Sequence, residues 1–186
     1  MSERLITPAA ALAVSLEAAR RAARVDVDAD GTSELDDDIA RSVRAFTREA
    51  EHDTGRAFVF QTWRLTLDRF SAALKSPRAP LASVAHVKFY DVDGVQQTLD
   101  PRDYLIDAES EPGYLVPAPG RAWPATANRI SAVEIEFVCG YGPDDALVPD
   151  EAKEYILARV NQKFAPVATA KVANFESLLD GIKVYG

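Results

Sequence analysis

The spacing of apolar residues changes twice along this chain of 186 residues, and these changes constrain its fold more than any other feature. As far as Gly55, apolar residues recur every three or four positions, which is the pattern of amphipathic helices. From Phe58 to Gly142 they alternate with polar residues, as in strands that bury one face. Helical spacing returns at Pro149. We therefore predict an α+β fold, a helical bundle with a mostly antiparallel β region inserted at about residues 57–142.

Signals for helix ends predict three main helices, at about residues 15–24, 34–54 and 149–164. Ser15 is a suitable N-cap for the first helix. Ser33 lies three residues before Asp36, which resembles a capping box for the second helix, and Gly55 suits the position after its last turn. A proline ends the third helix, and apolar steps of three and four then predict a final amphipathic helix that ends near Gly181.

Turn sequences divide the β region into strands. The sequence DVDG, at 91–94, predicts a tight turn between the two strands of a hairpin. Pro112 and Gly113 fit the central positions of a type II turn between a second pair of strands. A last alternating strand is predicted around Ile135.

The charge of the chain is unevenly distributed. The net charge is −8, and residues 26–38 hold seven acidic residues and no basic one. Proteins that bind nucleic acid through its phosphates normally carry a basic patch, and the sequence shows none. We therefore expect that the chain does not bind DNA specifically.

The remaining composition excludes other classes of protein. The single cysteine, Cys139, cannot form an intramolecular disulfide. No run approaches the roughly 18 apolar residues of a membrane span. An alanine-rich stretch near the N-terminus has acidic flanks, Glu3 and Glu17, unlike those of a signal peptide. The expectation is a soluble protein made in the cytoplasm, with no membrane partner and no cofactor.

Few residues are suited to catalysis. His52 lies near the end of a predicted helix, where a cation is favourable, and His86 lies on the polar side of a predicted strand. The sequence contains none of the nucleophile-elbow, zinc-protease, phosphate-loop or dinucleotide motifs. We therefore predict that the chain is not an enzyme and has no catalytic residues. A thiol enzyme that pairs Cys139 with His86 is an alternative.

A calcium-binding loop is a second alternative. Asp26, Asp28, Asp30, Gly31 and Asp37 match the alternating spacing of such loops. Asp37 is shorter than the usual bidentate glutamate, and an acidic stretch before a helix is commonly a solvated connector. Metal binding is therefore not the preferred interpretation.

Aromatic residues of the β region are a further candidate site. A small-ligand module would line a groove with Trp63, Tyr104, Tyr114, Trp123 and Tyr141. Packing within and between strands is the more common role of such residues.

The order of several segments resembles a known family. SLEAARRAARVD is followed by DDDIARSVRAFTREAEHDTGRAFVFQTWRLTLDRF, PLASVAHVKFYDVDGVQQTLDPRDYLID, AWPA, VEIEFVCGYG and VPDEAKEYILARV. Over about residues 12–163 this resembles the head–tail connector proteins, or head-completion adaptors, of long-tailed bacteriophages and gene transfer agents. Its most specific stretches are Thr54-Gly55-Arg56 before QTWRLTLD, and the segment from Val92 to Tyr104.

The resemblance implies a structural virion protein of the neck, made in the cytoplasm of a bacterial host. Such proteins form rings, usually of twelve copies, that dock on the portal protein and extend the DNA channel. They also receive the next neck protein, a stopper or tail terminator. DNA passes through without specific binding. A different neck protein, such as a stopper, remains an alternative. The connector domain would be residues 1–166.

Residues 167–186 depart from the family pattern, because many relatives end soon after the third helix. An amphipathic segment at this position is suited to dock in a groove of another chain. We expect it to insert against the portal, with packing on its own core as the alternative. The predicted anchors are Phe175, Leu178, Leu179, Ile182, Val184 and Tyr185.

The acidic charge also suits a DNA channel, since a wall that attracted phosphates would slow the passage of DNA. Some of these acids are therefore expected to face the lumen of the ring. The candidates are Asp28, Asp30, Glu34 and Asp36.

Overall fold

The computed structural model describes residues 1–165 and 175–184. These residues form two compact units. The β unit consists of Met1–Pro8 and Phe60–Tyr141, and the helical unit consists of Ala9–Val59 together with the described residues of 142–184. Within the described ranges, no helix is both long and apolar enough to cross a membrane.

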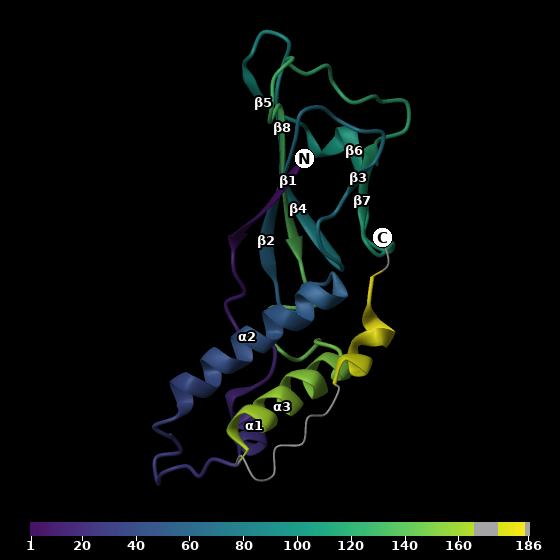
Figure 1. Cartoon of the computed structure of the whole chain (residues 1–186). Helices are drawn as coiled ribbons and strands as arrows, with labels where there is room; N and C mark the ends of the chain where they lie inside the picture. Colours follow the sequence, from purple (N-terminus) through teal and green to yellow (C-terminus); the bar gives the residue numbers. More distant parts are fainter. Residues whose placement is uncertain (166–174, 185–186) are drawn as a thin grey trace. The chain divides into compact units, whose positions relative to one another are not determined.

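The β unit contains two antiparallel sheets (Figure 1). The larger has five strands in the order β1 (Ser2–Thr7), β2 (Gln61–Leu67), β8 (Val133–Cys139), β4 (Leu81–Tyr90) and β5 (Gln96–Thr98). The smaller has the order β3 (Leu74–Lys75), β7 (Tyr114–Pro117) and β6 (Tyr104–Asp107), with a short 3₁₀ helix, η1 (Pro101–Asp103), before β6. The α+β fold class is thus confirmed.

The alternation read from the sequence fixes which face of the larger sheet is buried. Leu65, Ile135 and Val87 lie opposite one another on β2, β8 and β4, and all three are buried. Phe137 is fully buried between Trp63 and Val84 in the same register. Because neighbouring side chains in a strand point to opposite faces, the residues between them form a polar outer face.

The predicted hairpin turn is confirmed, and the predicted type II turn is wrong. In the turn between β4 and β5, Gly94 has a φ of 78°. The side-chain oxygen Oδ1 of Asp91 accepts hydrogen bonds from the backbone N–H groups of Asp93 and Val95. Gly113 has no positive φ, which a type II turn requires at its second central residue. Glycine is needed there for space, because a Cβ would lie 2.6 Å from Leu81 Cβ.

The strand β1 has no counterpart among the predicted elements. Its residues pair with β2, from Ser2 opposite Thr66 to Thr7 opposite Thr62. Most of β1 is exposed, so its sequence lacks the strong alternation of a half-buried strand. The pairing partner, about 60 residues away in the sequence, determines the element.

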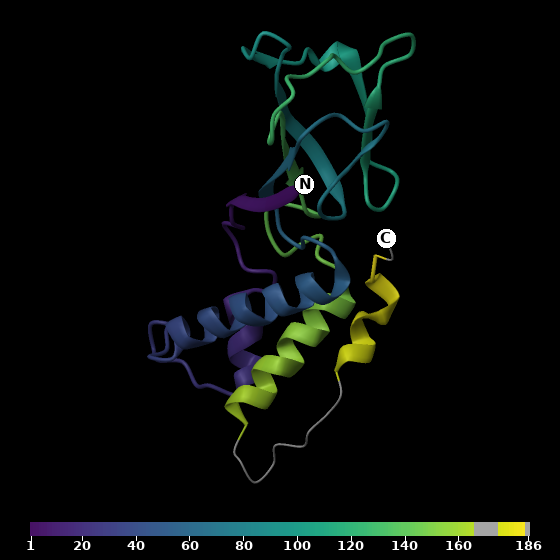
Figure 2. The same cartoon turned by 45° about the horizontal axis from the view of Figure 1, so that its top comes forward.

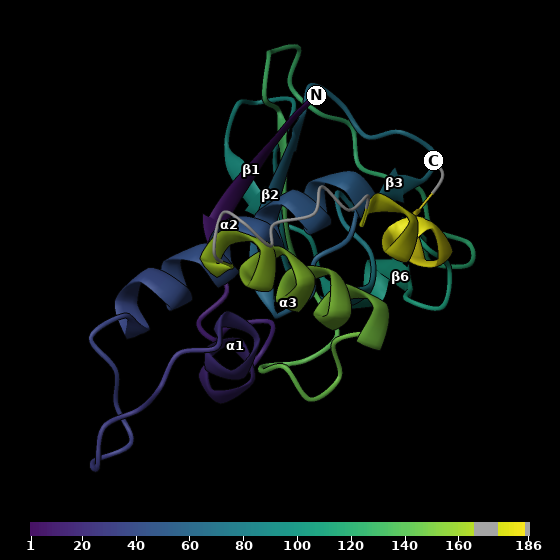
Figure 3. The same ribbon diagram turned by 60° about the horizontal axis from the view of Figure 1, so that its bottom comes forward.

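The helical unit contains α1 (Leu16–Ala23), α2 (Asp36–Thr54), α3 (Asp150–Phe164) and a 3₁₀ helix, η2 (Glu176–Ile182). The three α-helices lie within the predicted ranges to two residues. Helix α3 contacts all three others. Figure 2 shows α2 and α3 side by side with η2 next to α3, and Figure 3 shows α1 against α3.

Local chemistry explains the helix ends. Ser15 caps α1 by accepting a hydrogen bond from the backbone N–H of Ala18. Asp36 Oδ2 accepts from the backbone N–H of Ser33, which is one half of the predicted capping box. Gly55 ends α2 with a φ of 70°. The expectations for Ser15 and Gly55 are confirmed. The capping box is only half formed, because Leu35 is the N-cap of α2 and the Ser33 hydroxyl accepts from the N–H of Leu35 rather than from that of Asp36.

The predicted final α-helix is corrected where the structure describes it. Residues 166–174, the first part of that prediction, lie outside the described residues. The described part is the 3₁₀ helix η2, which packs on α3 and α2. Gly181, its sixth residue, and the few apolar contacts of so short a segment do not favour a longer regular helix.

Candidate functional site

The polar outer face of the five-stranded sheet carries a network of charged side chains. Strand register places Arg64 of β2, Glu136 of β8 and His86 of β4 in one row. Arg64 Nη2 lies 2.6 Å from Glu136 Oε1, and Nη1 lies 3.2 Å from Glu134 Oε2. The hydrogen bonds that Arg64 donates to Glu136 raise the pKa of its guanidinium. This row is therefore a cross-strand ion-pair network.

His86 belongs to the same network. Its Nε2 lies 3.5 Å from Glu134 Oε1, and its Nδ1 lies 3.8 Å from Glu136 Oε2. The three side chains offer ligand atoms within 4.8 Å of one another, the only such group in the described part of the chain. Arg64 already pairs with both carboxylates, and its positive charge opposes the entry of a divalent cation. The network is suited to holding strands together rather than to binding a metal.

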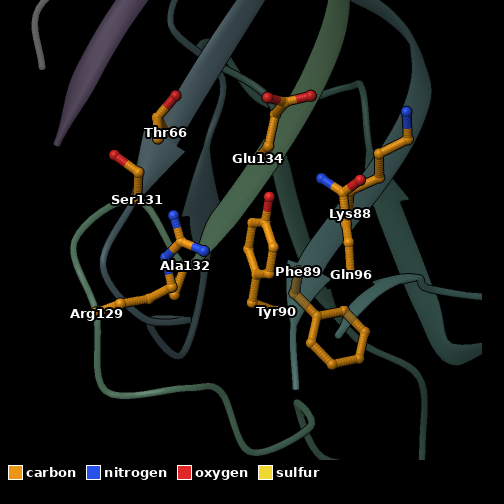
Figure 4. Close-up of a pocket in the computed structure, with 9 residues that line it drawn as sticks. All are labelled: Thr66, Lys88, Phe89, Tyr90, Gln96, Arg129, Ser131, Ala132 and Glu134. Atoms are coloured by element: carbon orange, nitrogen blue, oxygen red, sulfur yellow. The ribbon is translucent and has the colours of Figure 1, made fainter. Parts of the chain in front are cut away.

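A polar hollow of about 190 Å³ lies next to this network on the same face of the β unit (Figure 4). We call it the Arg129 hollow. Its lining residues come from β2, β4, β5, β8 and the segment before β8: Thr66, Lys88, Phe89, Tyr90, Gln96, Arg129, Ser131, Ala132 and Glu134.

Backbone hydrogen bonds hold the segment that carries Arg129 against β4. The N–H of Tyr90 donates to the carbonyl of Ala132, and the N–H of Ala127 donates to the carbonyl of Tyr90. The guanidinium carbon of Arg129 consequently lies 4.0 Å from the centre of the Tyr90 ring. Figure 4 shows the two side chains next to each other. A guanidinium over an aromatic face is a cation–π contact, which restricts its conformations.

Two cations of the Arg129 hollow lack an acidic partner. Among the described residues, no carboxylate oxygen forms an ion pair with Lys88 or Arg129. Glu134 also lines the hollow, but it pairs with Arg64 and contacts His86. The lining of the hollow therefore holds two cations against one carboxylate, in a chain whose net charge is −8.

The acidic loop, residues 26–38, belongs to the helical unit. Arg20 of α1 holds it by donating to both carboxylate oxygens of Asp36 and, at 2.8 Å, to the carbonyl of Gly31. The hydrogen bond from Arg20 lowers the pKa of Asp36. Asp36 is thereby neutralised, whereas Asp28 and Glu34 are exposed.

The loop does not gather the predicted calcium ligands. Asp26, Asp28, Asp30 and Asp37 are not among the described groups whose ligand atoms lie close enough to share an ion. Asp30 Oδ1 instead accepts hydrogen bonds from the backbone N–H and the hydroxyl of Thr32, which lower its pKa. The geometry is that of a polar connector closed by its own hydrogen bonds.

The thiol alternative is not supported by the arrangement of its residues. Cys139 lies opposite Leu81 in the sheet, whereas His86 lies opposite Glu136. The Cys139 side chain is fully buried, and burial raises the pKa of its thiol. Burial also raises the pKa of Tyr155, in the helical unit, to about 12. Both groups stay protonated at neutral pH and are poor nucleophiles.

The five aromatic residues proposed for a ligand groove do not line the Arg129 hollow. Trp123 stacks on Phe70 with ring centres 4.8 Å apart, and Arg78 lies over the ring of Trp63. Tyr104 is buried. Tyr90, which does line the hollow, was missed because sequence spacing does not bring Arg129 next to it.

The predicted docking residues occupy different environments in the helical unit. Leu179 is 1% exposed and faces its own helices, whereas Leu178 is 39% exposed. Phe175, Ile182 and Val184 are half-buried. Tyr185, the last predicted anchor, lies outside the described residues.

Hydrogen bonds attach this segment to the end of α2. The backbone N–H of Val184 donates to the carbonyl of Thr54 at 2.9 Å, and Arg56 Nε donates to the carbonyl of Ile182. Packing of part of the segment on its own core, the alternative considered from the sequence, is thus what the described residues show.

Comparisons with known proteins identify the fold. No family model matches the sequence, and no curated protein matches it significantly. Solved structures match over 100% of this chain and 97% of theirs. One is a chain of the virion of native gene transfer agent (GTA) particle, with a TM-score of 0.79 and 19% sequence identity. A second is from the neck of empty GTA particle computed with C6 symmetry, with a TM-score of 0.80 and 19% identity. A third is from the neck of native GTA particle computed with C12 symmetry, with a TM-score of 0.70 and 20% identity. The chain therefore shares its entire fold with these chains.

Proposed function

We propose that this chain is a structural protein of the neck of a virus-like particle, where it forms a ring between head and tail. The observation that carries the proposal is the structural match over the full length of this chain to chains of GTA virions and necks. A match that includes both units and the chain order supports a shared role more strongly than a match of one common motif would.

The charged groups agree with a role in assembly. In the charged cluster of the β unit Arg64 pairs with both Glu134 and Glu136, and the buried thiol has a raised pKa. The exposed polar features include a loop with seven acids and no base, and a hollow lined by two cations and one carboxylate. Such surfaces recognise other macromolecules through shape and charge.

We further propose that the ring has twelve copies and acts as the adaptor that docks on the portal. The symmetry of one matching neck, C12, supports the copy number. Leu178 and the half-buried Phe175 and Ile182 are the proposed contacts with the portal, because Leu179 is occupied within its own unit. The opposite side of the ring would receive a stopper or tail terminator.

Purified chain, alone and with the portal protein of the same genome, provides the test. Native mass spectrometry and electron microscopy are expected to show a closed ring of twelve copies, on the portal or free. A chain that stays monomeric in the presence of assembled portal and does not bind it would refute the proposal. Leu178→Asp is expected to weaken portal binding while the circular dichroism spectrum stays unchanged.

A further inference from the structure

We propose that the Arg129 hollow is a docking site for an acidic peptide segment, and that its occupant is the acidic loop of the next copy in the ring. The inference rests on the proposed function, because it requires copies arranged head to tail. In such a ring, each interface joins two different surfaces of the same chain, and the two must be complementary.

The hollow has the chemistry of a carboxylate receptor. Arg129 is held over the Tyr90 ring, so its planar donors lose little conformational freedom when they bind a carboxylate. Lys88 supplies a second cation from β4. Figure 4 shows the amide of Gln96 and the hydroxyls of Thr66 and Ser131 around the same hollow, where they add polar groups that can bond to a peptide.

The acidic loop has the properties of a matching ligand. Arg20 fixes it at Gly31 and Asp36, so the loop is partly ordered before it binds. Asp28 and Glu34 are exposed, and neither forms an ion pair with a described residue. The loop is therefore anchored by Arg20, while the carboxylates of Asp28 and Glu34 remain available.

The distribution of charge between the two units favours this pairing. The sequence gives the β unit a net charge of −2 and the helical unit one of −6. The loop alone contributes −7, so the rest of the helical unit carries +1. Lys88 and Arg129, on either side of the Tyr90 ring in Figure 4, offer two cations without an ion-pair partner among the described residues in one hollow.

DNA is the less favourable occupant of the same site. Binding of nucleic-acid phosphates requires a row of cations along the backbone. The hollow has two cations, and Glu134 forms part of its wall. A short acidic segment fits this mixed lining better than a continuous polyanion does.

Cross-linking in assembled rings tests the pairing directly. Equal amounts of ¹⁴N- and ¹⁵N-labelled chain are assembled, alone or on the portal, and treated with a carbodiimide, which joins lysine amines to nearby carboxylates. Mass spectrometry is expected to find Lys88 joined to a carboxylate of 26–38 in peptides of mixed isotope. Rings that form without this link, or links confined to one isotope, overturn the inference.

Charge-reversal substitutions test the same contact without a chemical cross-linker. One variant carries both Lys88→Glu and Arg129→Glu, and a second carries both Asp28→Lys and Glu34→Lys. Each variant is expected to assemble about tenfold more weakly than the wild type. The chain that carries all four changes is expected to regain assembly. The control variant carries both Arg69→Glu and Arg102→Glu, at two exposed arginines outside the hollow. It changes the net charge by the same amount as the first variant.

The outcomes separate this inference from the proposed function. If wild-type chain forms no ring and does not bind portal, the proposed function fails. If rings form and the charge reversals leave them unchanged, only the inference fails. If Asp28→Lys with Glu34→Lys spares assembly but raises retention on DNA in a salt-dependent way, the loop lines the channel, and the docking site is refuted.

Discussion

The two units of this protein bring charged residues together by different routes. In the helical unit, several ion pairs join near neighbours, such as Arg41 with Asp38, or residues on either side of one loop, as Arg20 with Asp36. Packing of α3 on α2 adds a distant pair, Arg159 with Glu49. In the β unit, Arg64 meets Glu136 across 72 positions of sequence. The difference follows from geometry, because helices pair residues three or four apart whereas strand register pairs distant ones. Surfaces of the helical unit can therefore be read from the sequence more easily than those of the β unit.

Loss of the β-unit core gives the largest expected effect. Phe137→Ala removes a fully buried ring at the centre of the register, and the free energy of unfolding should fall by about 3–5 kcal/mol. Chemical denaturation measures the change. Hydrogen exchange should increase in β2, β4 and β8 and stay low in α2 and α3, whereas a uniform increase would show that the two units unfold together. Val92→Ala, at a 68% exposed site, is the control.

The C-terminal segment tests whether the helical unit includes η2. Leu179→Ala should lower the free energy of unfolding by about 2–5 kcal/mol, because it leaves a cavity against α2 and α3. The matched change Leu178→Ala, at a 39% exposed site, should cost less than about 1 kcal/mol. Equal effects of the two changes would contradict the packing of η2 on its own unit. Thermal and urea unfolding provide the measurement.

Substitution of one glycine in each unit is expected to change the free energy of unfolding by a smaller amount, and for a different reason in each unit. Gly113→Ala in the β unit should cost about 1–3 kcal/mol, because the new Cβ would lie 2.6 Å from Leu81 Cβ. Gly55 in the helical unit has a positive φ, and a Cβ there would meet Val184 at an ordinary contact distance of 3.8 Å, so Gly55→Asn should cost less than about 1 kcal/mol. Comparison of the two melting temperatures tests this. A Gly55→Asn chain that is less stable than Gly113→Ala would refute the distinction between space and conformation.

The Arg20–Asp36 pair gives the smallest expected effect, and it depends on pH. The pKa of Asp36 in the folded chain lies below its ordinary value of 3.8, so the pair stabilises the fold above that pH. The contribution is lost as the pH falls through the folded pKa. The difference in stability between wild type and Arg20→Gln should therefore be present at pH 7 and shrink below about pH 4. A difference that is constant from pH 7 to pH 3 would show that the bond to the Gly31 carbonyl dominates.

The accuracy of the sequence-based predictions follows the same division between units. Ser15 and Gly55 act within one turn of their own helices, and their roles are predicted correctly. The capping box at Ser33 forms only in part, since Leu35 is the N-cap of α2. The strand β1 was missed because its pairing with β2 is distant, and the turn at Gly113 was misassigned because a neighbouring strand sets the requirement. The resemblance to GTA connector proteins agrees with the structural match at the level of fold.

The candidate site shows the same limit. The acidic loop was visible as seven acids without a base, but its closure by Arg20 and the separation of its carboxylates were not. The Arg129 hollow was not predicted at all. Lys88, Tyr90 and Arg129 carry no motif, and each is unremarkable in its own segment.

The α+β class, most helix ends and the location of the negative charge could be predicted without a structure, because each depends on residues within a few positions of one another. Only the tertiary structure decided which charges meet. Strand register brings Arg64 to Glu136, and backbone hydrogen bonds to Tyr90 hold the segment that carries Arg129 at the hollow that Lys88 also lines. Register depends on the packing of buried residues from the whole β unit.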